Sequence, residues 1–357
     1  MDYSTMSTKY STHAISFFRS FIERTTRGNL SASWMSDIAG LFMVATDALL
    51  KAHKFIVPEN GELFDSKWSD FEDLEIRLPF PVIAVEFRTP QKFGPSFQCD
   101  NTIALAMNRE GLRSFPYLND YVLRNIEEGN ADEVKVGGVA PISESDDFVL
   151  IWGISSVVDS ERWMVNPHAL VFRVSPDSLD LASGLEGCME MGGKVCPGER
   201  GRTVLSLDVL NDLVPIMNTK DAGEDFSGEY GKFLDGVKAC KYEVQAVKQL
   251  CQVLSCENIK SKIISPDAKL NKKREKSGKV KFFDYHILLI SGAEERESER
   301  EATSSHSSPR LHWRRGHIRI LSRGMERERR VWVRPCMVGN VENGILDKDY
   351  RLEKSEV

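Results

Sequence analysis

The period of the hydrophobic pattern changes along the chain, and this change constrains the fold more than any other feature. Apolar side chains recur every three or four residues over 12–27 and again over 33–55, a spacing that predicts two amphipathic helices. From residue 78 the pattern becomes that of a β-strand. We place the start of this strand near Pro81, because proline is tolerated at the first residue of a strand. The chain therefore begins with helices and continues into a sheet.

The same criteria predict the remaining elements. Strands are expected at 102–108, 147–158, 169–174, 282–290, 311–321 and 331–338, with a short one ending at Tyr350, and helices at 204–217 and 233–256. A turn at Asn166 and Pro167 would precede the strand at 169–174, and segments 120–147 and 184–201 are expected to be loops. The predicted class is α+β, with N-terminal helices, a mixed or antiparallel sheet and a basic, β-rich C-terminal region.

Charge divides the chain into an acidic body and a basic C-terminal region. Residues 1–256 hold 24 lysines and arginines against 37 acidic residues, a net charge of −13. Residues 257–357 hold 23 against 16, a net charge of +7. We therefore expect a helical segment at 1–60, an acidic α+β body at 61–256 and a basic β-rich region at 257–357. The split indicates a polyanionic or acidic partner.

The composition excludes several classes of protein. Hydrophobic residues make up 41% of the chain and charged residues 28%, which rules out wholesale disorder and a collagen-like repeat. The seven cysteines form no CxxC pair, which favours a reducing compartment. No apolar run approaches the roughly 20 residues that span a bilayer. We expect a cytoplasmic protein that uses no cofactor and binds no membrane.

Arginine and histidine are concentrated in the C-terminal region. Nine arginines and only two glutamates lie between residues 310 and 334, and three of the seven histidines lie between 306 and 317. Alternate residues of one continuous strand share a face. Such a strand would place His312, Arg314 and Gly316 on one side and Trp313, Arg315 and His317 on the other.

The candidate binding residues are cations, with one aromatic side chain and one glycine among them. They are Arg310, His312, Arg314, Arg315, Gly316, His317, Arg319, Trp332 and Arg334, together with Lys272, Lys273 and Arg274 from the basic run at 269–281. Arginine makes bidentate contacts with phosphate, and an aromatic ring can stack on a base. One interpretation is therefore an RNA-binding surface.

Other hypotheses account for the same residues. The cations could bind acidic groups of a peptide, or they could form a solvated hairpin that pairs with the acidic body. His312 and His317 could ligate a metal, although no carboxylate or CxxC pair stands beside them. In a ribonuclease, His317 would act as general acid or base while Arg310 stabilised the phosphate. The residues alone leave these alternatives open.

Glu86 interrupts the apolar run of the strand at 78–87. Val85 and Phe87 flank it, so its side chain is either buried with them or at an exposed edge. A buried carboxylate needs a partner, and an arginine of the C-terminal region is the partner that we expect in that case.

Two C-terminal runs resemble a known family. The runs are Pro309-Arg-Leu-His-Trp-Arg-Arg-Gly-His-Ile-Arg319 and Val331-Trp-Val-Arg-Pro-Cys-Met-Val-Gly339. They resemble the phage- and plasmid-encoded anti-CRISPR proteins of type V-A systems that suppress production of the effector nuclease. Residues 250–258, 269–274 and 279–289 are similar to that family as well, and residues 78–87 more distantly. The resemblance covers roughly the last 110 residues.

The resemblance implies a binding protein rather than a metabolic enzyme. By analogy with the characterised member of this family, the resemblance implies that the target polypeptide is recognised as it is made and that its message is lost. The implied partner is a host polypeptide, namely a CRISPR effector nuclease or its nascent chain, with RNA or the ribosome as a second partner. A phage or mobile-element protein that acts in host takeover, in the cytoplasm of the bacterium, is therefore the leading hypothesis. An RNA-binding accessory protein and a ribonuclease are the alternatives.

Overall fold

The chain forms two compact units. The computed structural model describes residues 9–27, 33–64, 77–93, 97–127, 132–136, 147–158, 160–173, 202–208, 241–290, 310–314, 316–321, 329–333, 336–338 and 340–345. The larger unit comprises Met1–Leu63, Phe71–Leu254 and Ser261–Leu288. The smaller unit comprises Phe64–Asp70, Ser255–Lys260 and Leu289–Val357. The domain boundaries expected from the charge pattern stay a prediction.

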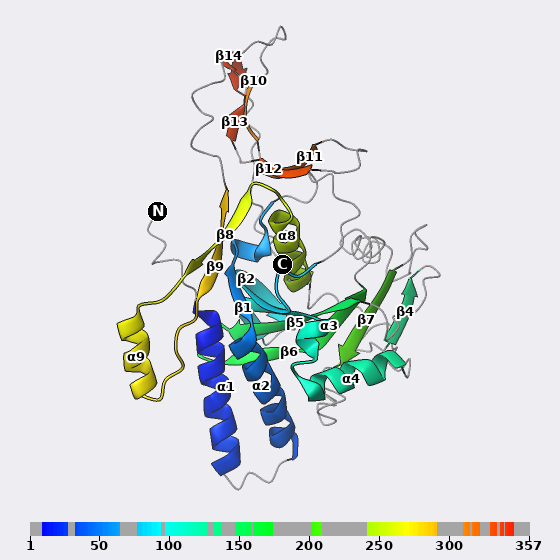
Figure 1. Cartoon of the computed structure of the whole chain (residues 1–357), viewed down its shortest axis with the longest axis vertical. Coiled ribbons are helices and arrows are strands. Elements are labelled where there is room, and N and C mark those ends of the chain that lie inside the picture. The colour runs from blue at the N-terminus through cyan, green and yellow to red at the C-terminus, as the bar shows by residue number, and fades with distance from the viewer. Residues whose placement is uncertain are drawn as a thin grey trace. The chain divides into compact units, whose positions relative to one another are not determined.

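Figure 1 shows the helices and strands coloured by their order along the chain. The helices are α1 (Tyr10–Arg27), α2 (Ser33–Lys51), the 3-10 helix η2 (Glu59–Gly61), α3 (Arg109–Leu112), α4 (Pro116–Glu127), α8 (Lys241–Leu254) and α9 (Ala268–Lys276). The strands are β1 (His53–Ile56), β2 (Val82–Phe93), β3 (Phe97–Asn108), β4 (Asp132–Val136), β5 (Phe148–Val157), β6 (Trp163–Arg173), β7 (Arg202–Asp208), β8 (Ile259–Ile264), β9 (Tyr285–Ile290), β10 (Arg310–Arg314), β11 (His317–Leu321), β12 (Arg329–Val333), β13 (Cys336–Val338) and β14 (Asn340–Ile345). The predicted α+β class is confirmed.

The principal sheet is mixed, as predicted. It has nine strands in the order β4-β7-β6-β5-β3-β2-β1-β9-β8. β1 runs parallel to β2 and to β9, while the chain of pairs from β2 through β3, β5, β6 and β7 to β4 is antiparallel. The C-terminal region adds a three-stranded sheet, β13-β10-β14, and a two-stranded sheet, β11-β12.

Both faces of the central strands are buried. Val82 and Ala84 of β2 belong to the hydrophobic cluster that includes α1 and α2, which lie side by side in Figure 1. Trp152 of β5 belongs to the same cluster, so the next residue, Gly153, points to the opposite face. A Cβ on Gly153 would lie 2.6 Å from the carboxyl of Glu243 in α8, which places α8 on that opposite face. The sheet is thus covered by helices on both sides, and its alternation was predicted correctly for β2.

Helix α2 ends at Lys51, before the predicted end at residue 55, and β1 follows it. Lys54 explains this difference. Its side chain is buried, and its ammonium group donates to the carbonyl oxygens of Leu49 and Ala52, each at 2.5 Å. A cation that binds the last carbonyls of a helix satisfies acceptors that have no partner within the helix and favours termination there.

Two predicted irregular regions are regular instead. The segment 120–147 was expected to be a loop, but α4 extends to Glu127 and β4 occupies Asp132–Val136. Leu118 and Val122 lie four residues apart on α4 and are buried, which explains why the helix forms. The predicted turn at Asn166 and Pro167 is also wrong, because β6 runs through both. The register between β5 and β6 shifts in this part of β6, and such an irregularity tolerates a proline.

The remaining predictions have mixed outcomes. Residues 202–208 form β7, so the helix predicted at 204–217 is wrong where it is described, and 209–217 lie outside the described residues. The helix predicted at 233–256 is confirmed as α8 over Lys241–Leu254, and 233–240 lie outside the described residues. The loop predicted at 184–201 lies outside the described residues. The strand predicted at 311–321 is two strands, β10 and β11, and the one at 331–338 is β12 and β13. None of the described helices combines the length and apolar composition needed to cross a membrane.

Candidate functional site

The predicted arginine and histidine surface is divided between two sheets. β10 carries Arg310, His312 and Arg314, and it pairs with β13 and β14. β11 carries His317 and Arg319, and it pairs with β12. The predicted face that these residues would share on one continuous strand is therefore wrong, because the strand ends between Arg314 and His317.

The break between β10 and β11 falls at Gly316, which is buried and lies outside both strands. Arg310 and His317, which the ribonuclease hypothesis brings together, begin different strands of different sheets. The sequence spacing between Arg310 and His317 therefore does not lie within one regular element. Two further candidates, Arg315 and Arg334, lie outside the described residues.

Strand β12 is fastened by the segment that precedes β8. The side-chain amide of Asn258 donates to the carbonyl oxygen of Trp332 at 2.9 Å, and its oxygen accepts the N–H of Trp332 at 2.7 Å. Glu257 forms an ion pair with Arg329 at 2.9 Å. The ring of Trp332 is partly buried, with its centre 5.7 Å from that of Phe64. Trp332 is thus packed within the smaller unit, while Arg319 on β11 is exposed.

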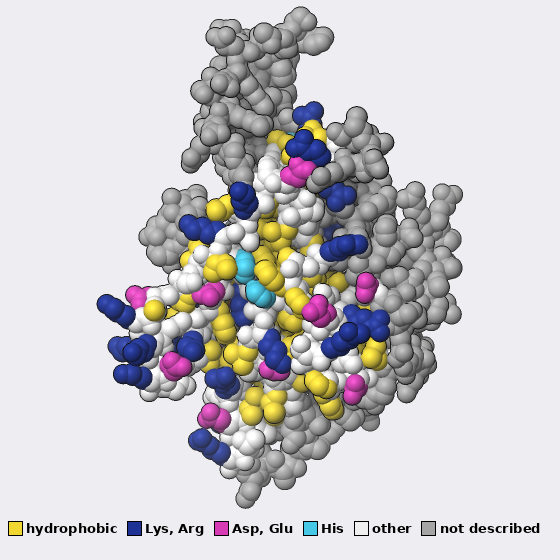
Figure 2. Space-filling view, in the orientation of Figure 1, with side chains coloured by type: hydrophobic (Ala, Val, Ile, Leu, Met, Phe, Trp, Pro, Cys, Tyr) yellow, Lys and Arg dark blue, Asp and Glu magenta, His cyan; other side chains and the backbone are white. Residues whose placement is uncertain are grey.

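The other predicted cations lie on α9 and divide into two kinds. Lys272 and Lys273 are exposed, and Figure 2 shows dark blue side chains gathered over the position of α9. Arg274 is partly buried instead: its guanidinium carbon lies 4.1 Å from the centre of the Phe282 ring, and its Nε donates to the carbonyl oxygen of Val280 at 2.7 Å. The two lysines face solvent, whereas Arg274 holds α9 against the returning chain.

Glu86 is buried, which is one of the two environments expected from the sequence, and hydroxyl and N–H groups hold its carboxylate. Its side chain is fully buried, and its carboxylate accepts the N–H groups of Tyr10 and Ser11 at 3.0 and 2.9 Å. The hydroxyl groups of Ser11 and Tyr285 donate to Oε1 at 2.6 and 3.0 Å. These two N–H groups begin α1, where the helix dipole favours a negative charge. Glu86 thus joins β2, α1 and β9 through backbone N–H and hydroxyl groups, where an arginine of the C-terminal region was the expected partner.

A polar groove of about 920 Å³ lies in the larger unit, and no sequence feature predicted it. Its lining includes His13, Ser16, Ser20 and Arg24 from α1, Asp100 and Asn101 from β3, Ser156 from β5, and Arg162 and Trp163 at the start of β6. These residues are separated by up to 150 positions in the chain, so no local spacing could bring them together. The groove offers hydroxyl, amide and charged groups of both signs.

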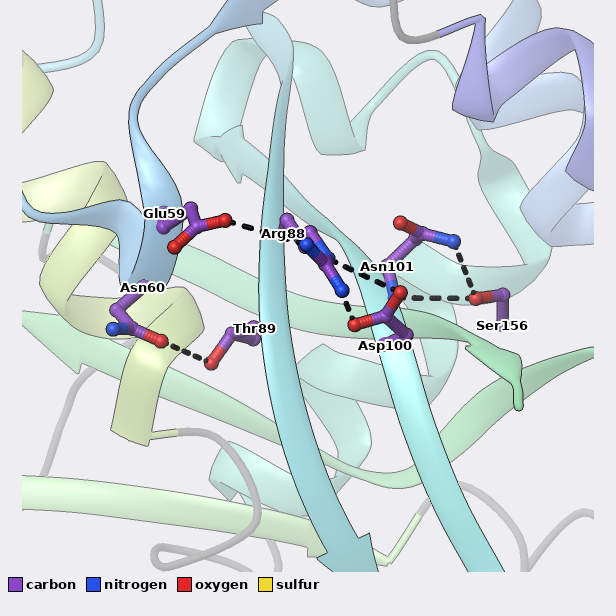
Figure 3. A network of polar contacts seen from close by, with 7 residues as sticks. All are labelled: Glu59, Asn60, Arg88, Thr89, Asp100, Asn101 and Ser156. Atoms are coloured by element: carbon purple, nitrogen blue, oxygen red, sulfur yellow. Dashed lines mark hydrogen bonds and ion pairs between the residues drawn. The ribbon is translucent and has the colours of Figure 1, made fainter. Parts of the chain in front are cut away.

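Figure 3 shows how the strand residues at one side of this groove are held. The hydroxyl of Ser156 accepts the side-chain N–H and the backbone N–H of Asn101, at 3.0 and 3.1 Å. Arg88 pairs with Asp100 at 3.0 Å and with Glu59 at 3.5 Å. The exposed Arg88 pair contributes little stability by itself, but it fixes the direction of the Asp100 carboxylate. The groove wall is therefore ordered by contacts between β2, β3 and β5.

Thiol and metal chemistry find little support among the described residues. Burial raises the pKa of Cys99 to about 11 and those of Cys251 and Cys256 to about 12, so these thiols stay protonated at neutral pH. Within the described part of the chain, no three histidine, cysteine, aspartate or glutamate side chains gather as a metal site requires.

Comparison with known protein families gives a match in the C-terminal region. No curated protein and no solved structure matches the chain. A family model does match, over a region that includes all the predicted binding residues. Residues 258–340 match the AcrVA2-like family, which is described as the anti-CRISPR type V subtype A2 family, and the resemblance of the C-terminal runs to this family is thereby confirmed.

Proposed function

We propose that this chain is an anti-CRISPR-like protein of a phage or mobile element that takes part in host takeover. It binds a polypeptide of a type V-A system, either the effector nuclease or its nascent chain, and lowers expression of the gene that encodes it. The family match over residues 258–340 carries this proposal. The match includes β9 to β13, and hence the arginine-rich strands in which the family resemblance was found.

The polar groove of the larger unit supports the polypeptide part of the proposal. Every residue of an extended peptide presents one N–H donor and one carbonyl acceptor, except proline, which lacks the donor. The groove lining provides acceptors and donors for such a chain in Asn101, Ser156 and Arg162. Its volume of about 920 Å³ falls in the range of sites that bury ligands larger than a single amino acid.

The test is coexpression with a type V-A interference system in bacteria. We expect the wild-type chain to lower the amount of effector nuclease and of its message, and to restore survival of a targeted plasmid. Unchanged effector level together with unchanged plasmid targeting would show that the assigned target is wrong. Immunoprecipitation of the tagged chain, followed by mass spectrometry, identifies the bound polypeptide directly.

A groove variant tests whether the polypeptide binds there. Arg24→Glu combined with Arg162→Glu reverses two exposed charges of the groove lining. The matched control combines Arg19→Glu with Arg113→Glu, which reverses two exposed charges outside the groove. We expect the groove variant to lose polypeptide recovery and the control to keep it. Equal recovery by both variants would place the polypeptide site elsewhere on the chain.

A further inference from the structure

Helix α9 forms although it contributes no side chain to a hydrophobic core. None of its residues is buried, yet it is closed at both ends. The carboxylate of Asp267 accepts the N–H groups of Lys269 and Leu270 at 2.6 and 3.1 Å, and Gly278 follows the helix with a φ of 66°. An isolated helix of this length is marginal in water, so these caps and the contacts of one helix face have to stabilise it.

One face of α9 is attached to the returning chain. The side chain of Asn271 donates to the carbonyl oxygen of Phe282 at 2.9 Å and accepts its N–H at 2.8 Å. Arg274, three residues later and therefore on the same face, lies over the Phe282 ring. The hydroxyl of Thr12 in α1 donates to the carbonyl oxygen of Lys281 at 3.2 Å. These contacts hold α9 and residues 279–283 together as an arm of the larger unit, which stands to one side of α1 in Figure 1.

The opposite face of α9 is a stripe of four lysines. Lys269, Lys272, Lys273 and Lys276 lie at positions i, i+3, i+4 and i+7, which places them on one side of a helix. All four are exposed. At 1.5 Å per residue the stripe is about 10 Å long. We call these four residues the lysine stripe.

The charge of the lysine stripe is not compensated within the described part of the chain. No ion pair joins any of the four ammonium groups to a described carboxylate. The two nearest acids in sequence are already engaged, since Glu275 pairs with Lys281 at 3.2 Å and Asp267 caps the helix. Four like charges held together on a rigid helix repel one another, so the structure maintains this arrangement at a cost in stability.

We propose that the lysine stripe binds the phosphate backbone of a nucleic acid. Interfaces between proteins are depleted of lysine and rich in aromatic residues, whereas lysine is a usual partner of backbone phosphates. The nearby rings offer no stacking surface, because Lys9 and Arg274 lie over Phe282 and Lys54 lies over Phe283. Binding is therefore electrostatic and independent of sequence. This contact is separate from the polypeptide groove, and each can fail without the other.

The experiment measures binding of the full chain to labelled single-stranded RNA and to duplex DNA of about 25 nucleotides, as a function of salt. The stripe variant replaces all four lysines by glutamine. Its charge-matched control is Arg19→Gln, Arg27→Gln, Lys51→Gln and Arg113→Gln, four exposed cations elsewhere on the larger unit. Because the lysine side chains make none of the contacts that hold the arm, circular dichroism is expected to be unchanged.

The expected result is a loss of salt dependence in the stripe variant alone. Four phosphate contacts change the slope of log affinity against log salt by about 2.8 for a single strand. Between about 50 and about 200 mM salt, the wild type then loses about 50-fold more affinity than the stripe variant does. Preference for RNA or for DNA identifies which nucleic acid is bound. Equal weakening in both variants, stronger competition by polyglutamate than by polyphosphate, or no binding by the wild type would each overturn the proposal.

Discussion

Glu243 provides the sharpest test of the reasoning about buried charge. It lies in the first turn of α8 and its side chain is fully buried. Among the described residues, neither of its carboxyl oxygens has a hydrogen-bond partner from another residue. Its carboxyl is directed at the backbone of Gly153, where the absence of a side chain leaves room for it. Burial raises the pKa of Glu243 from its ordinary value of 4.5 to about 8. The native chain therefore holds this carboxyl in the neutral form at neutral pH.

The sign and size of the effect on stability follow from this pKa. Below pH 4.5 both the folded and the unfolded chain carry the proton, so the contribution to stability is fully present. Between pH 4.5 and about 8 the unfolded chain has released this proton while the folded chain still holds it. The free energy of unfolding therefore falls by roughly 1.4 kcal/mol per pH unit. Over the whole window the loss approaches about 5 kcal/mol, a large share of the stability of an ordinary domain.

Urea unfolding of the wild type and of Glu243→Gln at pH 5, 6, 7 and 8 measures this loss. The amide cannot ionise, so the stability of the variant relative to wild type is expected to rise by about 1.4 kcal/mol per pH unit. Burying the amide has a free-energy cost of its own that does not depend on pH. This cost shifts the stability difference between variant and wild type by the same amount at every pH. Glu110→Gln, at an exposed residue, is the matched control for replacing a carboxyl by an amide. A constant difference between Glu243→Gln and wild type across the pH series would refute the neutral, buried carboxyl.

Three further predictions concern contacts that join distant parts of the chain. Glu86→Ala leaves four donors without their acceptor. We therefore expect chemical denaturation to show that the free energy of unfolding falls by at least about 3 kcal/mol, and by less for Glu86→Gln. Gly153→Ala puts a methyl group 2.6 Å from a carboxyl oxygen of Glu243. We expect a lower melting temperature, corresponding to a loss of about 1–3 kcal/mol in the free energy of unfolding. An unchanged melting temperature would contradict the close packing of α8 on β5. Asn258→Ala removes both side-chain contacts to Trp332, so hydrogen exchange at the Trp332 amide should become faster while exchange in the principal sheet stays the same.

The parts of the fold that could be predicted are those in which one local pattern decides the outcome. In β2, the apolar run and the proline before it predicted the start of the strand to within one residue, and the period of two predicted which residues share a face. In α8, apolar residues recur at three and four and meet the sheet, so the helix was predicted correctly. β7 and α4 show the limit of this approach. The run at 204–208 fits a short helix as well as a strand, and pairing with β6 and β4 decides for the strand.

The candidate site was harder to predict, because its partners are distant in sequence. Glu86 was noticed as an anomaly in an apolar strand, but its partners lie 75 to 199 residues away and are backbone and hydroxyl groups, which leave no charge pattern to follow. The arginine-rich runs were recognised from composition, but composition does not show that the strand ends at Gly316. In the sequence, the lysines of α9 and Arg274 belong to one basic run. The helical structure shows that the lysine stripe is exposed on one face, whereas Arg274 packs inward on the other.

The bounds of the family match are not bounds of a folding unit. β9 lies within residues 258–340, yet it is hydrogen-bonded to β1, with Tyr285 opposite Lys54 and His286 opposite Phe55. The Tyr285 hydroxyl donates to the buried carboxylate of Glu86, which also holds the start of α1. A fragment that begins at residue 258 would expose the β1-facing edge of β9 and leave this hydroxyl without its acceptor. The native environment of β9 therefore requires β1 and β2 of the principal sheet, so the lysine stripe and the groove have to be tested in the whole chain.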